Sequence, residues 1–113
     1  MKLVLLAALV AALVVPAAQA RTPKLVATDG PGFTITLTQS GKKVTHLKPG
    51  TYTITVADKS NIHNFHLAGP GLNKKTGVGF KGTTTWKVTL KKGTYKYVCD
   101  PHKSFMKGSF KVS

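Results

Sequence analysis

Apolar and polar residues alternate with a period of two along most of the chain after residue 20. In each alternating run, β-branched or aromatic residues occupy every second position, which is typical of half-buried β-strands. Beyond residue 20 no stretch has a helical period. The pattern therefore predicts an all-β domain, with strands expected over residues 33–37, 52–56, 86–90, 95–99 and 110–112.

Turn-forming residues separate these runs. About seven or eight short strands at this spacing indicate an antiparallel β-sandwich or a small barrel. Residues 68–82 form the longest stretch expected to be irregular, and a loop of that length is often functional or mobile. We find no internal repeat and no second domain, so we expect residues 21–113 to form one domain. Glycine and proline mark the turns at residues 30–32, 40–41, 49–50, 69–71 and 92–93.

The first twenty residues follow a different pattern. Lys2 precedes an unbroken apolar run over residues 3–15, then Pro16 and the small-residue pattern of residues 18–20 follow. These are the parts of a secretory signal peptide. The apolar run is shorter than the roughly 20 residues that span a bilayer. We predict a signal peptide over residues 1–20 and an exported domain, periplasmic or extracellular, without a transmembrane segment.

The number of cysteines limits what the thiol of this protein can do. Cys99 is the single cysteine, so no internal disulfide can form. A leftover thiol in an oxidising compartment is paired between chains, oxidised, or occupied by something else. A metal ion is one such occupant, and its binding also adds folding free energy.

The stretch from Cys99 to Met106 places a thiol, the imidazole of His102 and a thioether within eight residues. Soft sulfur ligands suit copper, and a His/His/Cys site with a weak axial Met is typical of blue-copper centres. A second imidazole would come from His63 or His66. Single features remain ambiguous, because a lone Cys is more often a small buried hydrophobe and zinc could also occupy such a site. A nucleophilic Cys–His pair would need an orienting third group, and the only nearby acid is Asp100.

Four motifs belong together: His63-Asn64, residues 93–99, Pro101-His102 and residues 106–108. In combination they resemble the cupredoxins, in particular the plastocyanin, amicyanin and pseudoazurin group. The resemblance implies an eight-stranded Greek-key β-sandwich with one type 1 copper, and a role in carrying single electrons. Its ligands would be His63, Cys99, His102 and Met106. Three residues separate His102 from Met106, whereas amicyanin-like loops have two and plastocyanin-like loops four.

The positions of His63 and His66 in the sequence indicate which of them would be the second imidazole ligand. Residues three apart on a strand point to opposite faces, so only one of His63 and His66 can face the metal. The family pattern places the ligand directly before an Asn that ties the ligand loops together, and Asn64 follows His63. We therefore favour His63, and we expect His66 to be an ordinary strand residue and His46 to lie on the surface.

The leading hypothesis is a secreted blue copper protein that carries one electron at a time between redox partners. The alternatives are an extracytoplasmic copper protein for delivery, storage or resistance, and a sandwich domain that serves as a binding module. No enzymatic activity is expected, because four protein ligands leave the copper no open position for substrate. Phe105 would form an apolar collar around the electron port at His102 or pack into the end of the sandwich.

The net charge of the protein says more about its binding partners than about its fold. The chain has 17 basic and 3 acidic residues and a net charge of +14 at pH 7. Nucleic acid is not expected, because the sequence lacks the interleaved aromatic and basic residues of RNA-binding domains and exported proteins seldom meet nucleic acid. We expect a monomer with an acidic redox partner, or attraction to anionic surfaces, with Lys103 and Lys107 steering the partner onto His102. Outward-facing strand lysines such as Lys87, Lys96 and Lys111 would be solvated.

Overall fold

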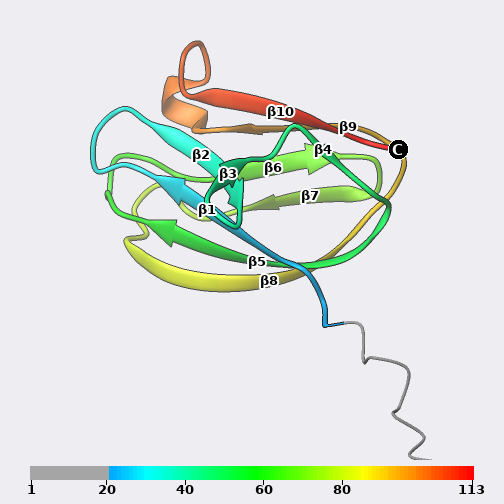
Figure 1. Ribbon diagram of the computed structural model, residues 1–113. Coiled ribbons are helices and arrows are strands. Elements are labelled where there is room, and N and C mark those ends of the chain that lie inside the picture. The colour runs from blue at the N-terminus through cyan, green and yellow to red at the C-terminus, as the bar shows by residue number, and fades with distance from the viewer. Residues whose placement is uncertain (1–20) are drawn as a thin grey trace, which may run out of the picture.

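Two five-stranded sheets pack face to face in the computed structural model, which describes residues 21–113 (Figure 1). This β-sandwich is the fold class that the sequence predicts. The predicted signal peptide over residues 1–20 lies outside the described residues. Within residues 21–113, no helix is long and apolar enough to cross a membrane.

The first sheet has the strand order β3-β2-β1-β5-β8, and the second has the order β4-β10-β9-β6-β7. Two of the ten strands, β3 and β4, contain only two residues each, so eight longer strands make up the sandwich. A single turn of 3-10 helix, η1, spans Asp100–His102. The strands are β1 Lys24–Asp29, β2 Ile35–Gln39, β3 Lys42–Lys43, β4 His46–Leu47, β5 Gly50–Asp58, β6 His66–Gly69, β7 Leu72–Lys75, β8 Gly82–Leu90, β9 Gly93–Val98 and β10 Lys107–Val112.

The sheets are mixed rather than purely antiparallel as predicted. Strand β1 pairs with β2 in the antiparallel sense and with β5 in the parallel sense. Strand β10 pairs antiparallel with β9 and parallel with β4. Alternation along a strand reports which face is buried, but it does not report the direction of the neighbouring strand. The expectation of an antiparallel sandwich was therefore wrong for these two pairs.

The stretch over residues 68–82, predicted to be irregular, contains a hairpin instead. Strands β6 and β7 pair antiparallel around the turn at residues 70–71, and Leu72 packs partly buried against the core. Strand β7 is the outer strand of its sheet, and its lysines are typical of an exposed edge. Such short, charged edge strands resemble loops in sequence. The irregular part is reduced to residues 76–81.

The core lies between the two sheets and includes the tyrosines of β9. Tyr95 and Tyr97 are buried, as their alternation predicts. Tyr95 stacks on Phe110 with ring centroids 5.4 Å apart, and Tyr97 stacks on Phe65 at the same separation. Pairs of this kind contribute about 0.5–1.5 kcal/mol beyond the area that they bury. Strand β9, which leads directly into Cys99, is thus fixed on its inner face by aromatic packing.

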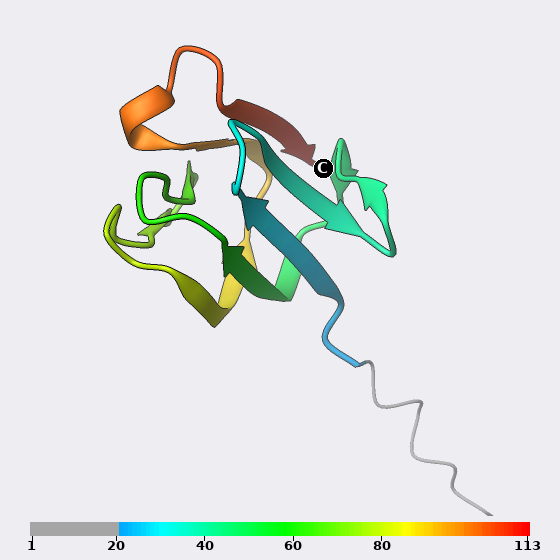
Figure 2. The ribbon, with the colours of Figure 1, turned by 90° about the vertical axis from the view of Figure 1, so that its left-hand side faces the viewer.

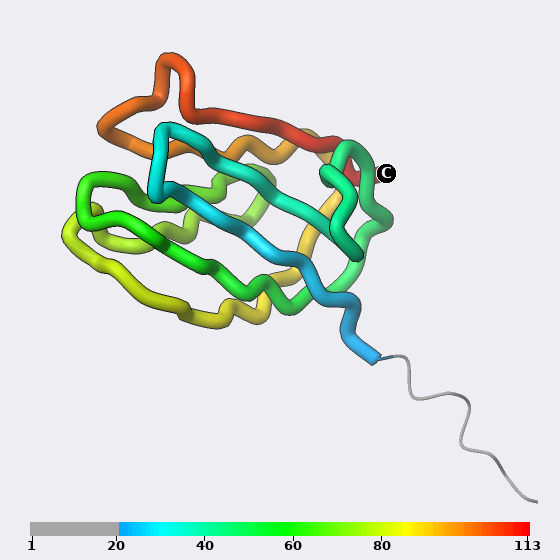
Figure 3. The backbone as a smooth tube through the Cα atoms, turned by 60° about the vertical axis from the view of Figure 1, so that its left-hand side comes forward, coloured from blue at the N-terminus to red at the C-terminus, as the bar shows by residue number. Residues whose placement is uncertain are grey.

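Four loops gather at one end of the sandwich, opposite the C-terminus (Figures 1 and 2). The tube in Figure 3 follows them as the β1–β2, β5–β6, β7–β8 and β9–β10 connections. They come from both sheets, so this end brings together residues that are far apart in the sequence. Every residue predicted to bind metal lies at this end, in the β5–β6 and β9–β10 loops.

Candidate metal centre

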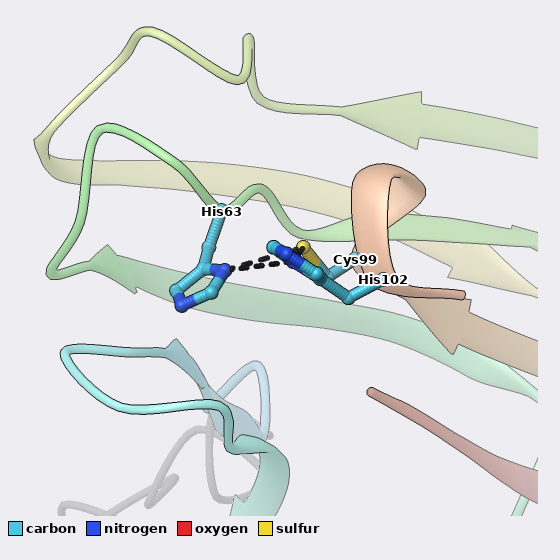
Figure 4. Close-up of side chains that lie close together, drawn as sticks. All are labelled: His63, Cys99 and His102. Atoms are coloured by element: carbon cyan, nitrogen blue, oxygen red, sulfur yellow. Dashed lines mark hydrogen bonds between the residues drawn. The ribbon is translucent and has the colours of Figure 1, made fainter. Parts of the chain in front are cut away.

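The side chains of His63, Cys99 and His102 converge at this end of the sandwich (Figure 4). The two Nδ1 atoms of the histidines lie 3.1 Å apart. The Cys99 Sγ lies 3.6 Å from the Nδ1 of His63 and 3.5 Å from that of His102. A metal bound at roughly 2.0 Å from each nitrogen and 2.3 Å from the sulfur would hold such donors roughly 3.3–3.7 Å apart. Both S···N separations fall in this range and the N···N separation is slightly shorter, so a small outward shift of the rings would fit the three donor atoms to one metal ion.

The β9–β10 loop is closed at its base by backbone hydrogen bonds. The Cys99 N–H donates to the Met106 carbonyl at 3.0 Å, and the His102 N–H donates to the Cys99 carbonyl at 2.9 Å. The N–H groups of Phe105 and Met106 both donate to the His102 carbonyl, at 3.1 and 2.8 Å. Pro101 lies inside the 3-10 turn, where its fixed φ suits the conformation and its missing N–H costs no bond. The positions of Cys99 and His102 are thus fixed relative to each other.

Packing holds the side of the His63 ring that faces away from Cys99 and His102. The residue is fully buried, and among the described residues its Nε2 has no hydrogen-bond partner. Phe33 meets the ring edge-on, with centroids 5.1 Å apart. Gly30 lies behind it in a left-handed conformation, with φ of 71°, and a Cβ there would lie 3.2 Å from the His63 Cδ2 and 3.0 Å from the Ser60 Cβ. A residue with a side chain would be strained by this backbone conformation and would press on the ring.

Asn64 ties the two ligand loops together, as the family resemblance implies. Its Nδ2 donates to the Asp100 Oδ2 at 2.8 Å and to the Thr76 carbonyl at 3.1 Å. Its Oδ1 accepts the Asp100 backbone N–H at 2.7 Å. The side chain of Thr76 in turn accepts the Phe65 N–H at 3.0 Å. Asn64, which directly follows His63, therefore connects its loop to Asp100, the residue after Cys99, and to the loop at residues 76–81.

His66 and His46 lie outside the cluster. The His66 ring is hydrogen-bonded to the Asp100 carboxylate at 2.8 Å and, through its other nitrogen, to Asn73. Burial lowers the pKa of His66, but the hydrogen bonds to Asp100 and Asn73 outweigh it and raise the pKa overall. His46 is exposed and contacts the Ser113 hydroxyl. Of the candidate histidines, only His63 and His102 face Cys99.

The chemistry of the donor set favours a soft metal cation. Cys99 is fully buried, and burial raises the pKa of its thiol, although backbone hydrogen bonds from Asn64 and His102 oppose this. A buried thiolate is costly without a compensating positive charge, and a coordinated metal ion supplies that charge. Two imidazoles and one thiolate form the mixed N/S set that copper prefers.

His102 is the one member of the cluster that reaches the surface. It is partly exposed, whereas His63 and Cys99 are buried. Phe33 stands edge-on to it at 5.0 Å, and Phe105 lies 5.6 Å away. Both phenylalanines are more than half exposed, at 58% and 59%. Phe105 therefore borders the His102 edge and is not packed into the sandwich.

Phe33 is a site residue that the sequence pattern did not identify. Alternation placed it in a strand, but β2 begins at Ile35 and Phe33 lies in the preceding bend. There it contacts both His63 and His102. The available signal was the segment of residues 30–32, whose Gly-Pro-Gly sequence ends a strand and turns the chain just before Phe33.

Met106 is buried, with 1% of its surface exposed. Its backbone closes the loop on Cys99, as described above, so the residue lies at the same end of the sandwich as the three converging donors.

Two buried carboxyl groups also lie toward this end. Asp29 and Asp58 are register partners at the ends of β1 and β5. Burial and then the neighbouring Asp58 raise the pKa of Asp29 to about 8.

Comparison with known families agrees with this geometry. Residues 37–113 match the family described as copper binding proteins of the plastocyanin/azurin family. The chain belongs to that family. It is thus a cupredoxin, and its bound metal is a type 1 copper.

Solved structures of two members resemble this cupredoxin. Rusticyanin from Thiobacillus ferrooxidans is 27% identical, with a TM-score of 0.57 over 81% of this chain and 77% of that one. Reduced rusticyanin is 25% identical, with a TM-score of 0.59 over 81% and 79%. An oxidised amicyanin variant, 24% identical with a TM-score of 0.52 over 80% and 82%, shares the fold. Comparison with curated proteins finds no match for this chain.

Proposed function

We propose that this cupredoxin is an exported one-electron carrier in which His63, Cys99 and His102 bind the copper and Met106 supplies a weak fourth contact. One observation carries the proposal: three of these four residues are buried, and the partly exposed His102 lies against two exposed phenylalanines. Such an arrangement lets an electron leave through one ring while the ion itself stays enclosed.

The rigidity of the surrounding shell supports a carrier role. Cu(I) and Cu(II) prefer different geometries, so a site that holds its ligands fixed reduces the rearrangement at each transfer. The loop from Cys99 to Met106 is closed by its own backbone hydrogen bonds, and Asn64 links it to the loop that holds His63. Both imidazoles are thus restrained independently of the metal.

The decisive experiment on the site is a visible absorption spectrum of the purified protein after addition of Cu(II). We expect an intense band toward the red end of the spectrum, which disappears in Cys99→Ser because the serine hydroxyl cannot supply the thiolate. A spectrum without that band, or an equal band in the serine variant, would exclude the proposed ligand set.

A second experiment separates electron carriage from copper delivery. A carrier retains its ion while it cycles, so repeated reduction and oxidation in the presence of a Cu(I) chelator should leave the bound copper unchanged. A delivery protein would release Cu(I) to the chelator within a few cycles. Retention is expected here, because His63 and Cys99 are fully buried and a competing ligand can approach only past His102.

Export and an acidic partner belong to the same proposal. The N-terminal segment supports export, and mass spectrometry of the secreted protein should give a chain that begins at Arg21. The net charge of +14 favours a partner with an acidic surface. Raising the ionic strength should slow the reaction with such a partner, because the screening length falls to about 8 Å at physiological salt.

A further inference from the structure

The outer face of the second sheet carries closely spaced lysines. In the β9–β10 pairing, Lys96 is opposite Ser109, and Lys107 and Lys111 lie two residues to either side of that serine. All three lysines are exposed. Diagonal neighbours in an antiparallel pair lie roughly 7–8 Å apart. The three ammonium groups therefore share a small area and repel one another.

This face is hollowed next to the metal end. A hollow of about 430 Å³ is lined by residues of β9 and β10 and by Lys43 from β3 of the other sheet. We call it the lysine hollow. A smaller hollow of about 170 Å³ continues from it toward β2 and shares Lys43 and Lys107 with it. The residues that line the lysine hollow are Lys43, Lys96, Val98, Lys107, Gly108 and Ser109.

No acidic side chain of this protein neutralises the lysine hollow. The sequence contains three acidic residues in all. Asp29 and Asp58 are buried inside the sandwich, and Asp100 is bonded to His66 and Asn64. Repulsion among unpaired like charges raises the free energy of the folded state. Carboxylates supplied from outside would remove that repulsion.

The lysine hollow adjoins the proposed electron port. Val98 directly precedes Cys99 and Lys107 directly follows Met106, so two lining residues are chain neighbours of proposed ligands. A molecule seated there would lie beside the β9–β10 loop that carries His102. Because the site is concave, it fits a projecting segment better than a flat bilayer surface, which would contact protruding lysines elsewhere on the molecule.

We propose that the lysine hollow receives an acidic surface segment of the redox partner, whose Asp or Glu carboxylates pair with Lys43, Lys96 and Lys107. This inference rests on the proposed electron-carrier function and adds where the partner is held. Apolar contact around His102 would then position the two redox centres, while the hollow sets the orientation of the partner.

The test is a titration of the reduced, copper-loaded protein with a hexaglutamate peptide, followed by amide chemical shifts at low ionic strength. We expect the largest shifts over residues 94–98 and 107–111. In Lys96→Gln/Lys107→Gln the peptide should bind roughly threefold to tenfold more weakly, in keeping with two exposed ion pairs. The matched control is Lys24→Gln/Lys87→Gln, which removes the same charge from exposed positions of the first sheet and should bind the peptide as tightly as the parent.

Equal weakening in the two double variants would overturn the inference, because net charge alone would then explain binding. Shifts centred on Lys103, or spread evenly over all lysines, would overturn it as well. Vesicles containing phosphatidylglycerol should bind both variants equally, and a specific loss in Lys96→Gln/Lys107→Gln would indicate a membrane site instead. Both variants should retain the visible copper band, so failure of the proposed copper site would be recognised separately.

Discussion

Asn64 and Asp100 exchange two hydrogen bonds across the metal end of the sandwich. The Asn64 amide donates to the Asp100 carboxylate, and the Asp100 backbone N–H donates back to the Asn64 carbonyl oxygen. Each residue directly follows a proposed copper ligand, so this pair fixes the separation of the two ligand loops. Burial pushes the pKa of Asp100 up, but the bonds from His66 and Asn64 outweigh it and lower the pKa.

Replacing Asn64 should therefore loosen the copper site and the fold together. Asn64→Ala loses two bonds to Asp100 and one to Thr76, and we expect the free energy of unfolding to fall by about 2–4 kcal/mol. Electron exchange should also slow, because the two loops can then move apart between oxidation states. The control is Asn73→Ala, which removes an exposed contact to His66 and should cost less than about 1 kcal/mol. Equal losses in the two variants would contradict this role for Asn64.

Replacing His63 and replacing His66 should have very different effects on the visible band of the Cu(II) form. His63→Ala removes a donor from the cluster of Figure 4 and should abolish the intense visible band of the Cu(II) form. His66→Ala removes a ring that bonds Asp100 and Asn73 and should leave the band in place. Absorption spectra of the two variants after Cu(II) addition test this. A band that survives in His63→Ala and disappears in His66→Ala would reverse the assignment.

Gly30 is expected to control the orientation of the His63 ring. In Gly30→Ala the new Cβ would press on Ser60 and His63, and the left-handed backbone alone costs roughly 1–2 kcal/mol for a residue with a side chain. We expect a lower unfolding temperature and an altered electron paramagnetic resonance spectrum of the Cu(II) form. Gly32→Ala is the matched control, because its Cβ would meet nothing within 4 Å. An unchanged spectrum in Gly30→Ala would show that the ring does not depend on this contact.

The buried carboxyl of Asp29 should make stability fall as the pH rises. Its pKa is raised from an ordinary value of 3.8 to about 8, first by burial and then by Asp58. Between these two values the folded protein keeps a proton that the unfolded chain has released, so raising the pH favours unfolding. We expect the difference in Tm between Asp29→Asn and the parent to grow in favour of the variant from about pH 4 to about pH 8. A constant difference across that range would mean that Asp29 ionises normally.

The ionisation of Asp100 should change the stability with pH in the direction opposite to that of Asp29, and the same comparison of Tm values tests it. Its lowered pKa adds stability that is present above the ordinary aspartate range and is lost as the pH falls through the lowered value. Asp100→Asn should therefore be less stable than the parent at neutral pH, with the gap closing in acid.

The two phenylalanines beside His102 should affect transfer more than binding. Phe33→Ala and Phe105→Ala each remove an exposed ring that borders His102. We expect slower electron exchange with a partner and an intact visible band, both measured on the same samples. Val78→Ala, which shortens an exposed apolar residue elsewhere, should leave both unchanged. Loss of the band in Phe105→Ala would make Phe105 a packing residue of the copper site itself.

Much of this architecture could be predicted from the amino-acid sequence. Alternation reports burial directly, so Tyr95 and Tyr97 were assigned correctly to the core. The family motif favoured His63 over His66, and the structure brings His63 to Cys99 and His102.

What could not be predicted depends on contacts between distant segments. The parallel partners of β1 and β10 leave no trace in the alternation of either strand. Phe33 fits a strand pattern by itself, and only the fold reveals that it leaves β2 to contact two histidines. The burial of Asp29 beside Asp58 likewise follows from the parallel register of β1 and β5, which local sequence does not encode.

The position of β10 between β4 and β9 has a consequence for the order of events during biogenesis. A polypeptide leaves the ribosome or an export channel from its N-terminus, so His63 is released well before the segment that closes the Cys99–Met106 loop. That loop is anchored at both ends only when β10 has paired with β9 and β4. We therefore expect copper capture at the complete site to be a late step of folding, because the emerging chain presents only His63 of the four proposed ligands until Cys99, His102 and Met106 follow.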